Sequence, residues 1–198
     1  MTRPSRALPI LLAALALAGC SYSVNGSALP DPSATTTAAV KTSTPSSSSA
    51  PTGPAPKIAK PRTVTGVDPC KMLDAADLKS IGAFKREPRR QDDAVQESCQ
   101  FVLDDGSANG RTVLTALYQR YEQVRDRQKG GQEQLVDGHS TWLFCQLNGP
   151  EEVCTATIAV NANRSILVAM TQTGGRPEQM VAAMAPLLKA ALARIPVA

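Results

Sequence analysis

The sequence predicts an α+β domain with an antiparallel sheet of about four to six strands, a short N-terminal helical region and a long C-terminal amphipathic helix packed on one face of the sheet. Two observations predict it. Short runs of alternating apolar residues, separated by turns rich in Gly, Asn and Asp, follow one another between residues 99 and 171. Residues 177–195 instead repeat apolar side chains at intervals of three and four, as an amphipathic helix does.

The N-terminal stretch predicts export and lipid attachment. Arg3 and Arg6 precede an apolar run, residues 7–18, which is too short to span a bilayer but fits a secretory signal peptide. Leu17-Ala18-Gly19-Cys20 resembles the lipobox of bacterial lipoproteins, in which a peptidase cuts before the cysteine and the thiol carries a diacylglyceryl group. Residues 1–19 are then a lipoprotein signal peptide, and Cys20 is the lipidation site. The alternative is an ordinary signal peptide in which Cys20 is incidental.

Residues 20–62 are predicted as the lipidated cysteine followed by a disordered tether. The segment is rich in Pro, Ser and Thr and has almost no large apolar side chain, so it cannot bury enough surface to offset its ordering entropy.

Residues 63–198 then form a single globular domain. This domain carries 15 basic and 16 acidic residues. Because it is near neutral, a nucleic-acid partner is not expected.

Two helix starts are predicted ahead of the strands. Asp68 supplies an N-cap, and the proline after it suits the first helical position. Asp74 can cap a second helix, and Asp77 favours the positive end of that helix. The polar residues 85–96 are predicted as a loop.

The strands are predicted from alternation and from the turn residues between them. Residues 165–171 are apolar on both faces, which predicts a central strand. Residues 121–129 are charged and are predicted as a short exposed helix. The remaining strands are predicted at 99–103, 111–119, 135–136, 141–146 and 153–160.

The hairpin of residues 141–160 determines which side chains share a face. If Cys145 lies opposite Cys154, then Phe144 faces Thr155. Since side chains alternate along a strand, Trp142 and Phe144 point away from the face that carries the two cysteines. Which face the C-terminal helix covers stays open.

Five cysteines become an even set once Cys20 is assigned to lipid. The other four, Cys70, Cys99, Cys145 and Cys154, allow three pairings. The short segment between Cys145 and Cys154 is typical of a hairpin, so we expect Cys145–Cys154 and Cys70–Cys99. A zinc site is the alternative, but zinc sites usually bring cysteines in close pairs, which are missing here. We expect neither a metal nor a cofactor.

The opening of the domain resembles a known family. Val67-Asp68-Pro69-Cys70-Lys71-Met72-Leu73, then Cys99-Gln100-Phe101, then a closing helix, all behind a lipobox and a Pro/Ser/Thr tether, are similar to the actinobacterial lipoproteins catalogued as DUF3558. The resemblance covers roughly residues 66–195. It implies a cell-envelope lipoprotein without an assigned activity, and it supports the pairing of Cys70 with Cys99.

Two groups of residues are candidates for binding. A basic cluster in the predicted loop is either an anion-binding patch for phosphorylated polymers and lipid headgroups or a solvated loop balanced by nearby acids; it comprises Lys85, Arg86, Arg89 and Arg90. Trp142 and Phe144 either pack beneath the C-terminal helix or form a binding surface, where aromatic residues are enriched.

No catalytic residue is predicted. His139 is the only histidine, so a Ser-His-Asp or Cys-His arrangement would have to use it. Its place at a turn into a strand predicts a surface or strand-edge residue. The carboxylate pairs at 92–93, 104–105 and 151–152 lie in predicted loops, which favours solvated charges over acid–base chemistry.

These features predict a protein held by Cys20 on the extracytoplasmic face of the cell membrane. We expect a non-enzymatic binding or accessory module whose partner is an envelope protein or a lipid or glycan ligand. Two alternatives remain open. One is a carrier of an apolar or lipid ligand in a cavity between helix and sheet, and the other is an envelope enzyme that uses Asp, Ser or Tyr chemistry.

Overall fold

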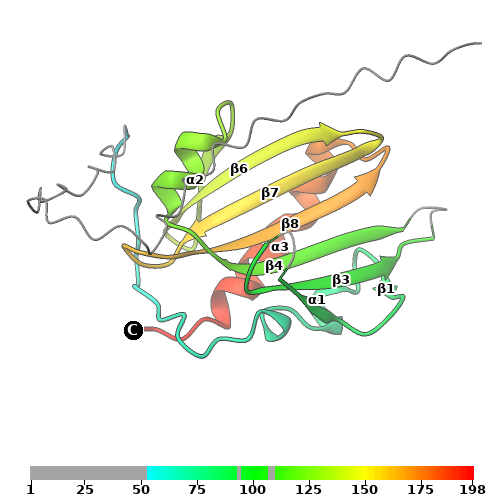
Figure 1. Ribbon diagram of the computed structural model, residues 1–198, viewed down its shortest axis with the longest axis horizontal. Helices are drawn as coiled ribbons and strands as arrows, with labels where there is room; N and C mark the ends of the chain where they lie inside the picture. Colours follow the sequence, from blue (N-terminus) through cyan, green and yellow to red (C-terminus); the bar gives the residue numbers. More distant parts are fainter. Residues whose placement is uncertain (1–52, 93–94, 107–109) are drawn as a thin grey trace, which may run out of the picture. The chain divides into compact units, whose positions relative to one another are not determined.

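The computed structural model describes residues 53–92, 95–106 and 110–198 (Figure 1). The predicted signal peptide, Cys20 and the tether up to residue 52 lie outside the described residues. The helices are a short 3₁₀ helix η1 (Pro69–Lys71), α1 (Ala75–Leu78), α2 (Tyr121–Arg127) and α3 (Pro177–Ala193), and the strands are β1 (Ala83–Phe84), β2 (Arg89–Gln91), β3 (Ser98–Asp104), β4 (Arg111–Tyr118), β5 (Gln132–Val136), β6 (His139–Asn148), β7 (Glu151–Ala159) and β8 (Ser165–Thr173). None of the helices described is long and apolar enough to cross a membrane.

The strands form one antiparallel sheet in the order β1-β3-β4-β8-β7-β6-β5, with β2 also paired to β3. The predicted fold class is confirmed, and β8 is central as expected. The described sheet has eight strands rather than four to six. The excess comes from β1 and β2. Arg90 in β2 pairs with Cys99 through the main chain, but β2 has no apolar alternation, so the sequence pattern could not show it.

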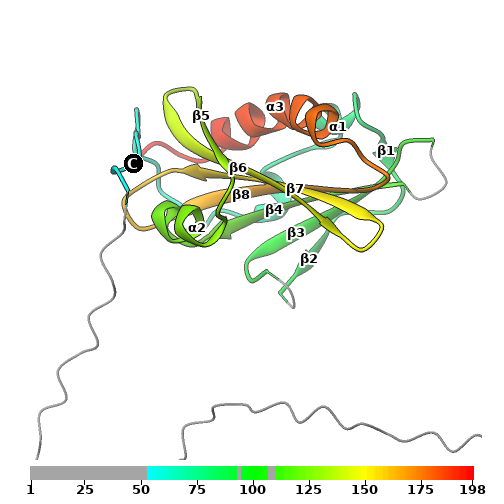
Figure 2. The ribbon, with the colours of Figure 1, turned by 90° about the horizontal axis from the view of Figure 1, so that it is seen from above.

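Helices lie on both faces of the sheet, and the two longest, α3 and α2, are on opposite faces (Figure 2). The long α3 packs against β7 and β8 on the face that carries the hairpin disulfide, and its fully buried Met184 and Leu187 belong to the same core as Ala156 and Ile158. Burying a side chain of this size contributes about 1.5–3 kcal/mol. The short α2 lies on the opposite face, against β6 and β7.

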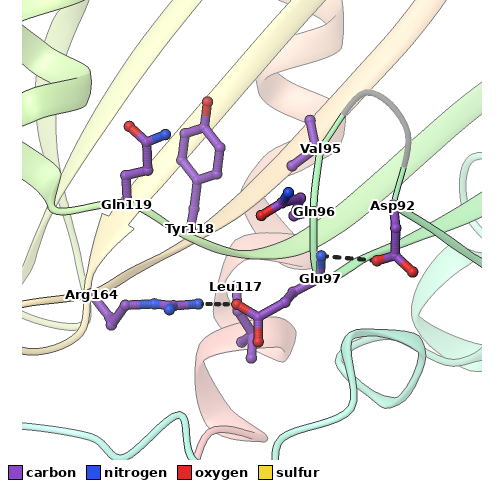
Figure 3. A pocket seen from close by; sticks show the side chains of 8 residues that line it. All are labelled: Asp92, Val95, Gln96, Glu97, Leu117, Tyr118, Gln119 and Arg164. Atoms are coloured by element: carbon purple, nitrogen blue, oxygen red, sulfur yellow. Dashed lines mark hydrogen bonds and ion pairs between the residues drawn. The ribbon is translucent and has the colours of Figure 1, made fainter. Parts of the chain in front are cut away.

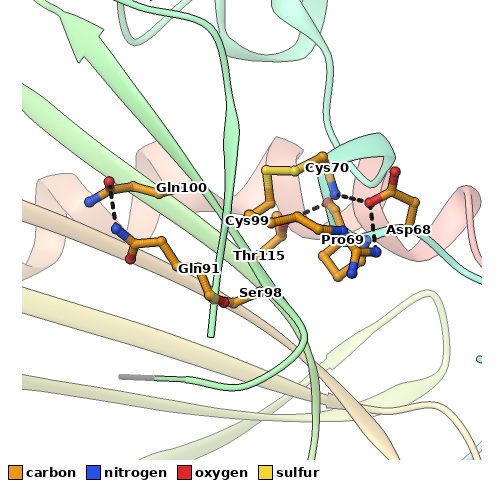
Figure 4. The surroundings of a disulfide bond; sticks show 9 residues. Asp68, Pro69, Cys70, Gln91, Ser98, Cys99, Gln100 and Thr115 are labelled. Atoms are coloured by element: carbon orange, nitrogen blue, oxygen red, sulfur yellow. Dashed lines mark hydrogen bonds and ion pairs between the residues drawn. A yellow bond between two sulfur atoms is a disulfide. The ribbon is translucent and has the colours of Figure 1, made fainter. Parts of the chain in front are cut away.

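Both disulfides form as the sequence predicts. Cys145 pairs with Cys154 inside the β6–β7 hairpin, in the predicted register, with Phe144 opposite Thr155. Cys70 and Cys99 join η1 to β3 (Figure 4). The side chain of Asp68 accepts a hydrogen bond from the Cys70 N–H at 3.1 Å, which confirms the predicted N-cap.

The predicted helix start at Asp74 is also confirmed. Its side chain accepts hydrogen bonds from the N–H groups of Ala76 and Asp77, while the Asp77 carboxylate accepts one from the Asp74 N–H at 2.9 Å. This reciprocal capping box satisfies main-chain N–H groups at the start of α1. Arg194, which follows α3, forms ion pairs with both carboxylates and links the two ends of the domain.

Residues 53–62, which the composition assigns to the tether, lie against the sheet. Lys57 and Ser140 exchange hydrogen bonds: the Lys57 N–H donates to Ser140 Oγ at 2.9 Å, and the Ser140 N–H donates to the Lys57 carbonyl at 2.8 Å. Arg62 then bridges Val197 near the C-terminus. These contacts form because β6 begins before its pairing with β7, which leaves main-chain groups for an extended segment.

Candidate functional site

The face of the sheet opposite α3 carries its side chains in rows, because the strands are in continuous register. The row nearest α2 comprises Ser98, Ala116, Leu167, Thr157 and Trp142. The middle row comprises Gln100, Leu114, Ala169, Thr155 and Phe144. The outer row comprises Val102, Thr112, Thr171, Val153 and Gln146. We call the middle and outer rows the open face.

The row nearest α2 is closed. Ala116 and Thr157 are fully buried. Trp142 is half-buried, and its indole N–H donates a hydrogen bond to the Gln128 carbonyl at 3.2 Å, in the connection between α2 and β5. Of the two aromatic candidates, Trp142 is therefore a packing residue beside α2, whereas Phe144 stands on the open face.

The open face is uncharged. Nine of its ten side chains are half-buried, and the tenth, Gln146, is exposed. The ten are aliphatic, aromatic, hydroxyl or amide groups, and none carries a charge. Sparse charge and half-buried apolar side chains characterise the centres of protein interfaces. Such a surface can bind a partner by desolvation without having to strip water from an ion.

α2 limits the open face and is itself anchored. The sequence predicts α2 as exposed, and that prediction is wrong, because Tyr121, Val124 and Arg125 are buried. Their spacing of three and one places them on one side of the helix. The Arg125 guanidinium lies 5.9 Å from the centre of the Tyr121 ring and donates to the Pro54 carbonyl at 2.7 Å. Burial raises the pKa of Tyr121 far above its usual range, and the charge of Glu133 adds to this, so the phenol stays neutral.

A cleft of about 420 Å³ lies where β4 leads into α2 (Figure 3). Tyr118 and Gln119 line one side of it, and the turn before β3 lines the other. Glu97 holds this turn, since its N–H donates to Asp92 Oδ1 at 3.1 Å and its carboxylate pairs with Arg164. The cleft offers hydroxyl, amide and carboxylate groups for hydrogen bonds to a polar ligand.

The basic cluster does not converge on one point. Arg89 and Arg90 are neighbours in β2, so their side chains point to opposite faces of the sheet. Arg90 forms an ion pair with Asp68 at 3.2 Å, and Arg86 donates to the Gln100 side chain at 3.0 Å. Lys85 is exposed. The four charges thus line the edge formed by β1 and β2 instead of surrounding a single anion site.

His139 and Ser140, the first two residues of β6, are inaccessible. His139 begins β6, but it is 1 % exposed, and its Nδ1 lies 2.8 Å from the Ala159 carbonyl. The expectation of a surface position is therefore wrong, because residues 57–58 cover this end of β6. Ser140 Oγ donates to Glu133 Oε1 at 2.6 Å, yet Ser140 is fully buried, so no substrate can reach it.

Among the described residues, one group of side chains has the spacing of metal ligands. The sulfurs of Cys145 and Cys154 and a carboxylate oxygen of Glu152 lie within 4.8 Å of one another. Both sulfurs belong to the disulfide, and the thiolate is the form of cysteine that binds metals. In the oxidised protein this group therefore offers a metal one carboxylate.

Sequence reasoning placed Phe144 on the correct face and missed most of the open face. The rows follow from the register, and the register of β4 against β8 has no local signal. The cleft beside Tyr118 is assembled from three distant segments, around residues 95, 118 and 164, and could not be predicted for the same reason.

Comparison with known proteins identifies a family. A family model described as "Protein of unknown function (DUF3558)" matches residues 15–186. No curated protein and no solved structure matches the chain.

Proposed function

This chain belongs to the DUF3558 family, and from that premise we propose that it is a lipid-anchored lipoprotein of an actinobacterial cell envelope that works as a non-enzymatic binding module. The family description assigns no activity, so the proposal is argued from the residues.

The anchor is proposed at Cys20. The lipobox-like residues that end in Cys20 follow a short apolar run, and a processed lipoprotein cysteine carries at least two acyl chains, enough for stable attachment without a transmembrane helix. The Pro, Ser and Thr content of residues 21–52 suits a tether. Coil statistics give such a length a span of roughly 30 Å, which would hold the domain off the membrane.

The open face supports a binding role most directly. It is a continuous surface over β3, β4, β8, β7 and β6 whose ten side chains are uncharged. Arg89 of β2 lies beside Gln100 at one end of the middle row, and Gln128, at the end of α2, donates to Thr155 Oγ1 at 3.3 Å. Five of its ten side chains are apolar and none is charged, and protein interfaces are likewise depleted of charge at their centres. This single observation carries the proposal.

The partner is proposed to be another protein of the envelope. Small molecules are held in concave pockets that enclose most of their surface, whereas the open face is a broad sheet surface. The buried positions of His139 and Ser140 support a role without catalysis.

Site-specific crosslinking in cells tests this proposal. The photo-crosslinker p-benzoylphenylalanine is placed at Leu114, in the middle row, and separately at Ala185, which is exposed on α3. We expect Leu114 to crosslink to one envelope protein and Ala185 to give no such product. Ala169→Arg should abolish the product from Leu114, while Ala182→Arg on α3 should leave it unchanged. Equal crosslinking from both positions, or a product insensitive to Ala169→Arg, would contradict the proposal.

A carrier of apolar ligands is the weaker alternative. It needs an enclosed cavity between α3 and the sheet, whereas the cleft beside Tyr118 is open to solvent. Native mass spectrometry of the detergent-purified protein separates the two functions. Lipid retained at one molecule per chain, in addition to the acyl groups on Cys20, would favour the carrier.

A further inference from the structure

β6 is longer than the strand beside it. β5 pairs with His139–Leu143 and ends there, whereas β6 continues to Asn148. Within the described part of the chain, residues 144–148 pair with β7 on one side and with no strand on the other. We call residues 144–148 the free edge. β6 is the uppermost of the strands labelled in Figure 1.

The free edge presents main-chain groups in line with β5. The Cα atoms of Cys145 and Cys154 are 4.0 Å apart. Such a narrow antiparallel pair is the kind whose N–H and C=O groups point away from each other. Cys145, and Leu147 two residues further on, therefore direct two donors and two acceptors outward. The disulfide holds the register, so this set of groups is preformed.

The other edges of the sheet are protected and the free edge is not. Proteins keep edge strands from pairing by placing charges and proline on them. The edge formed by β1 and β2 has the basic cluster and Pro88, and β5 has Glu133. The free edge, Phe-Cys-Gln-Leu-Asn, has neither charge nor proline, and its Leu147 is 73 % exposed.

A cleft of about 530 Å³ adjoins the free edge. Leu143, Phe144 and Cys145 line it from β6, and Pro177, Glu178 and Val181 line it from α3. Glu178 is the one ionisable side chain among the lining residues. A ligand that lies here meets an apolar surface and a single negative charge.

At its other end β6 already binds an extended segment. Lys57 exchanges two hydrogen bonds with Ser140, and Ile58 bridges His139, beyond the point where β7 begins to pair. The chain thus uses strand addition to cover one exposed stretch of β6 and leaves the other stretch without a strand in the described residues.

We propose that the free edge binds an extended peptide segment of a partner protein as an added β-strand, with a basic side chain of the peptide beside Glu178. The added strand continues the line of β5. Its residues opposite Cys145 and Leu147 point to the α3 side, where apolar side chains contact Val181 and Leu147. Its basic residue complements Glu178. The free edge shares Phe144 and Gln146 with the open face, but it binds through main-chain groups of β6, and its test does not depend on the proposed function.

The probe is a fluorescein-labelled peptide, Lys-Thr-Val-Thr-Val-Thr-Lys, titrated into the full-length lipidated protein in detergent and followed by fluorescence polarisation. The control peptide has the same sequence with N-methylated main-chain amides. We expect the N-methylated peptide to bind at least tenfold more weakly, because it cannot donate main-chain hydrogen bonds. Amide hydrogen exchange should show that the unmodified peptide protects residues 144–148.

Three variants test the position. Leu147→Asp should weaken binding about tenfold. Glu178→Lys should also weaken it, and added salt should then raise the affinity of the variant, whereas it lowers the affinity of the unchanged protein. The matched control is Leu135→Asp, which changes an exposed leucine of β5 and should leave the affinity unchanged.

Four results would overturn the proposal: no saturable binding at millimolar peptide, equal binding of the N-methylated peptide, protection confined to other residues, or an equal loss with Leu135→Asp. Protection of residues 144–148 that rises with protein concentration in the absence of peptide would overturn it too, because it would assign this edge to a second copy of the chain.

Discussion

Removing each disulfide in turn tests whether the two bonds stabilise the domain through the loops they close. Cys70–Cys99 closes a loop with a sequence separation of 29, and Cys145–Cys154 one with a separation of 9. Loop-closure entropy then predicts losses of about 3.6 kcal/mol for the first pair and about 2.6 kcal/mol for the second. The variants are Cys70→Ala with Cys99→Ala, and Cys145→Ala with Cys154→Ala.

The two pairs form a matched comparison because their packing is alike. Each joins one fully buried cysteine, Cys99 or Cys154, to a half-buried one. The loss of sulfur contacts is therefore similar in both variants, and their difference of about 1 kcal/mol reports the loop length. Both variants also carry Cys20→Ala, which blocks lipidation. Urea denaturation then measures the free energy of unfolding of each variant.

The outcome depends on the hairpin. If the β6–β7 turn persists in the unfolded chain, the short loop has little entropy to lose, and Cys145–Cys154 will contribute less than its calculated share. A larger loss for Cys145–Cys154 than for Cys70–Cys99 would refute the loop argument. It would mean that strain or packing, and not chain entropy, sets the contribution of these bonds.

Three further predictions concern the scaffold. Leu187→Ala, in the buried face of α3, should lower the free energy of unfolding by about 2–5 kcal/mol, measured by urea denaturation. Gly131→Ala should destabilise the α2–β5 connection, because a Cβ there would lie 2.7 Å from the Leu143 carbonyl; faster hydrogen exchange in β5 would show it. Main-chain N–H groups at two helix caps lower the pKa of Asp68 and of Asp74, so both carboxylates stabilise the fold above pH 4 and lose this effect as the pH falls through their folded-state pKa values. The acid branch of the stability curve should therefore be shallower in Asp74→Ala than in the unchanged protein.

The hairpin and the helix starts could be predicted because their signals are local. Asp68 and Asp74 are followed at fixed spacing by the N–H groups they cap. Two cysteines nine residues apart around a Gly-Pro turn imply one register, and that register placed Phe144 opposite Thr155.

The remaining features depend on contacts between distant segments. β2 is a strand because its main chain pairs with β3, although Arg89 and Arg90 show no apolar alternation. One side of α2 is buried, and there Arg125 donates to the Pro54 carbonyl and lies over the Tyr121 ring. The many charged residues of this helix gave no sign of a buried side in the sequence. Whether α3 would cover the disulfide face or the opposite one could not be decided from periodicity, since both faces of β8 are apolar.

The contacts of residues 53–62 determine which part of the domain is loaded first when the chain is pulled from its N-terminal side. A pull from the N-terminal side reaches the bond from Arg125 to the Pro54 carbonyl first, then the Lys57–Ser140 pair, and then the bridge from Arg62 to Val197. These contacts are loaded one after another, so they can open in that order and need not break together. The strand pairs of the sheet and both disulfides lie behind them. Residues 53–62 can therefore detach while the strand pairs that shape the open face stay in place.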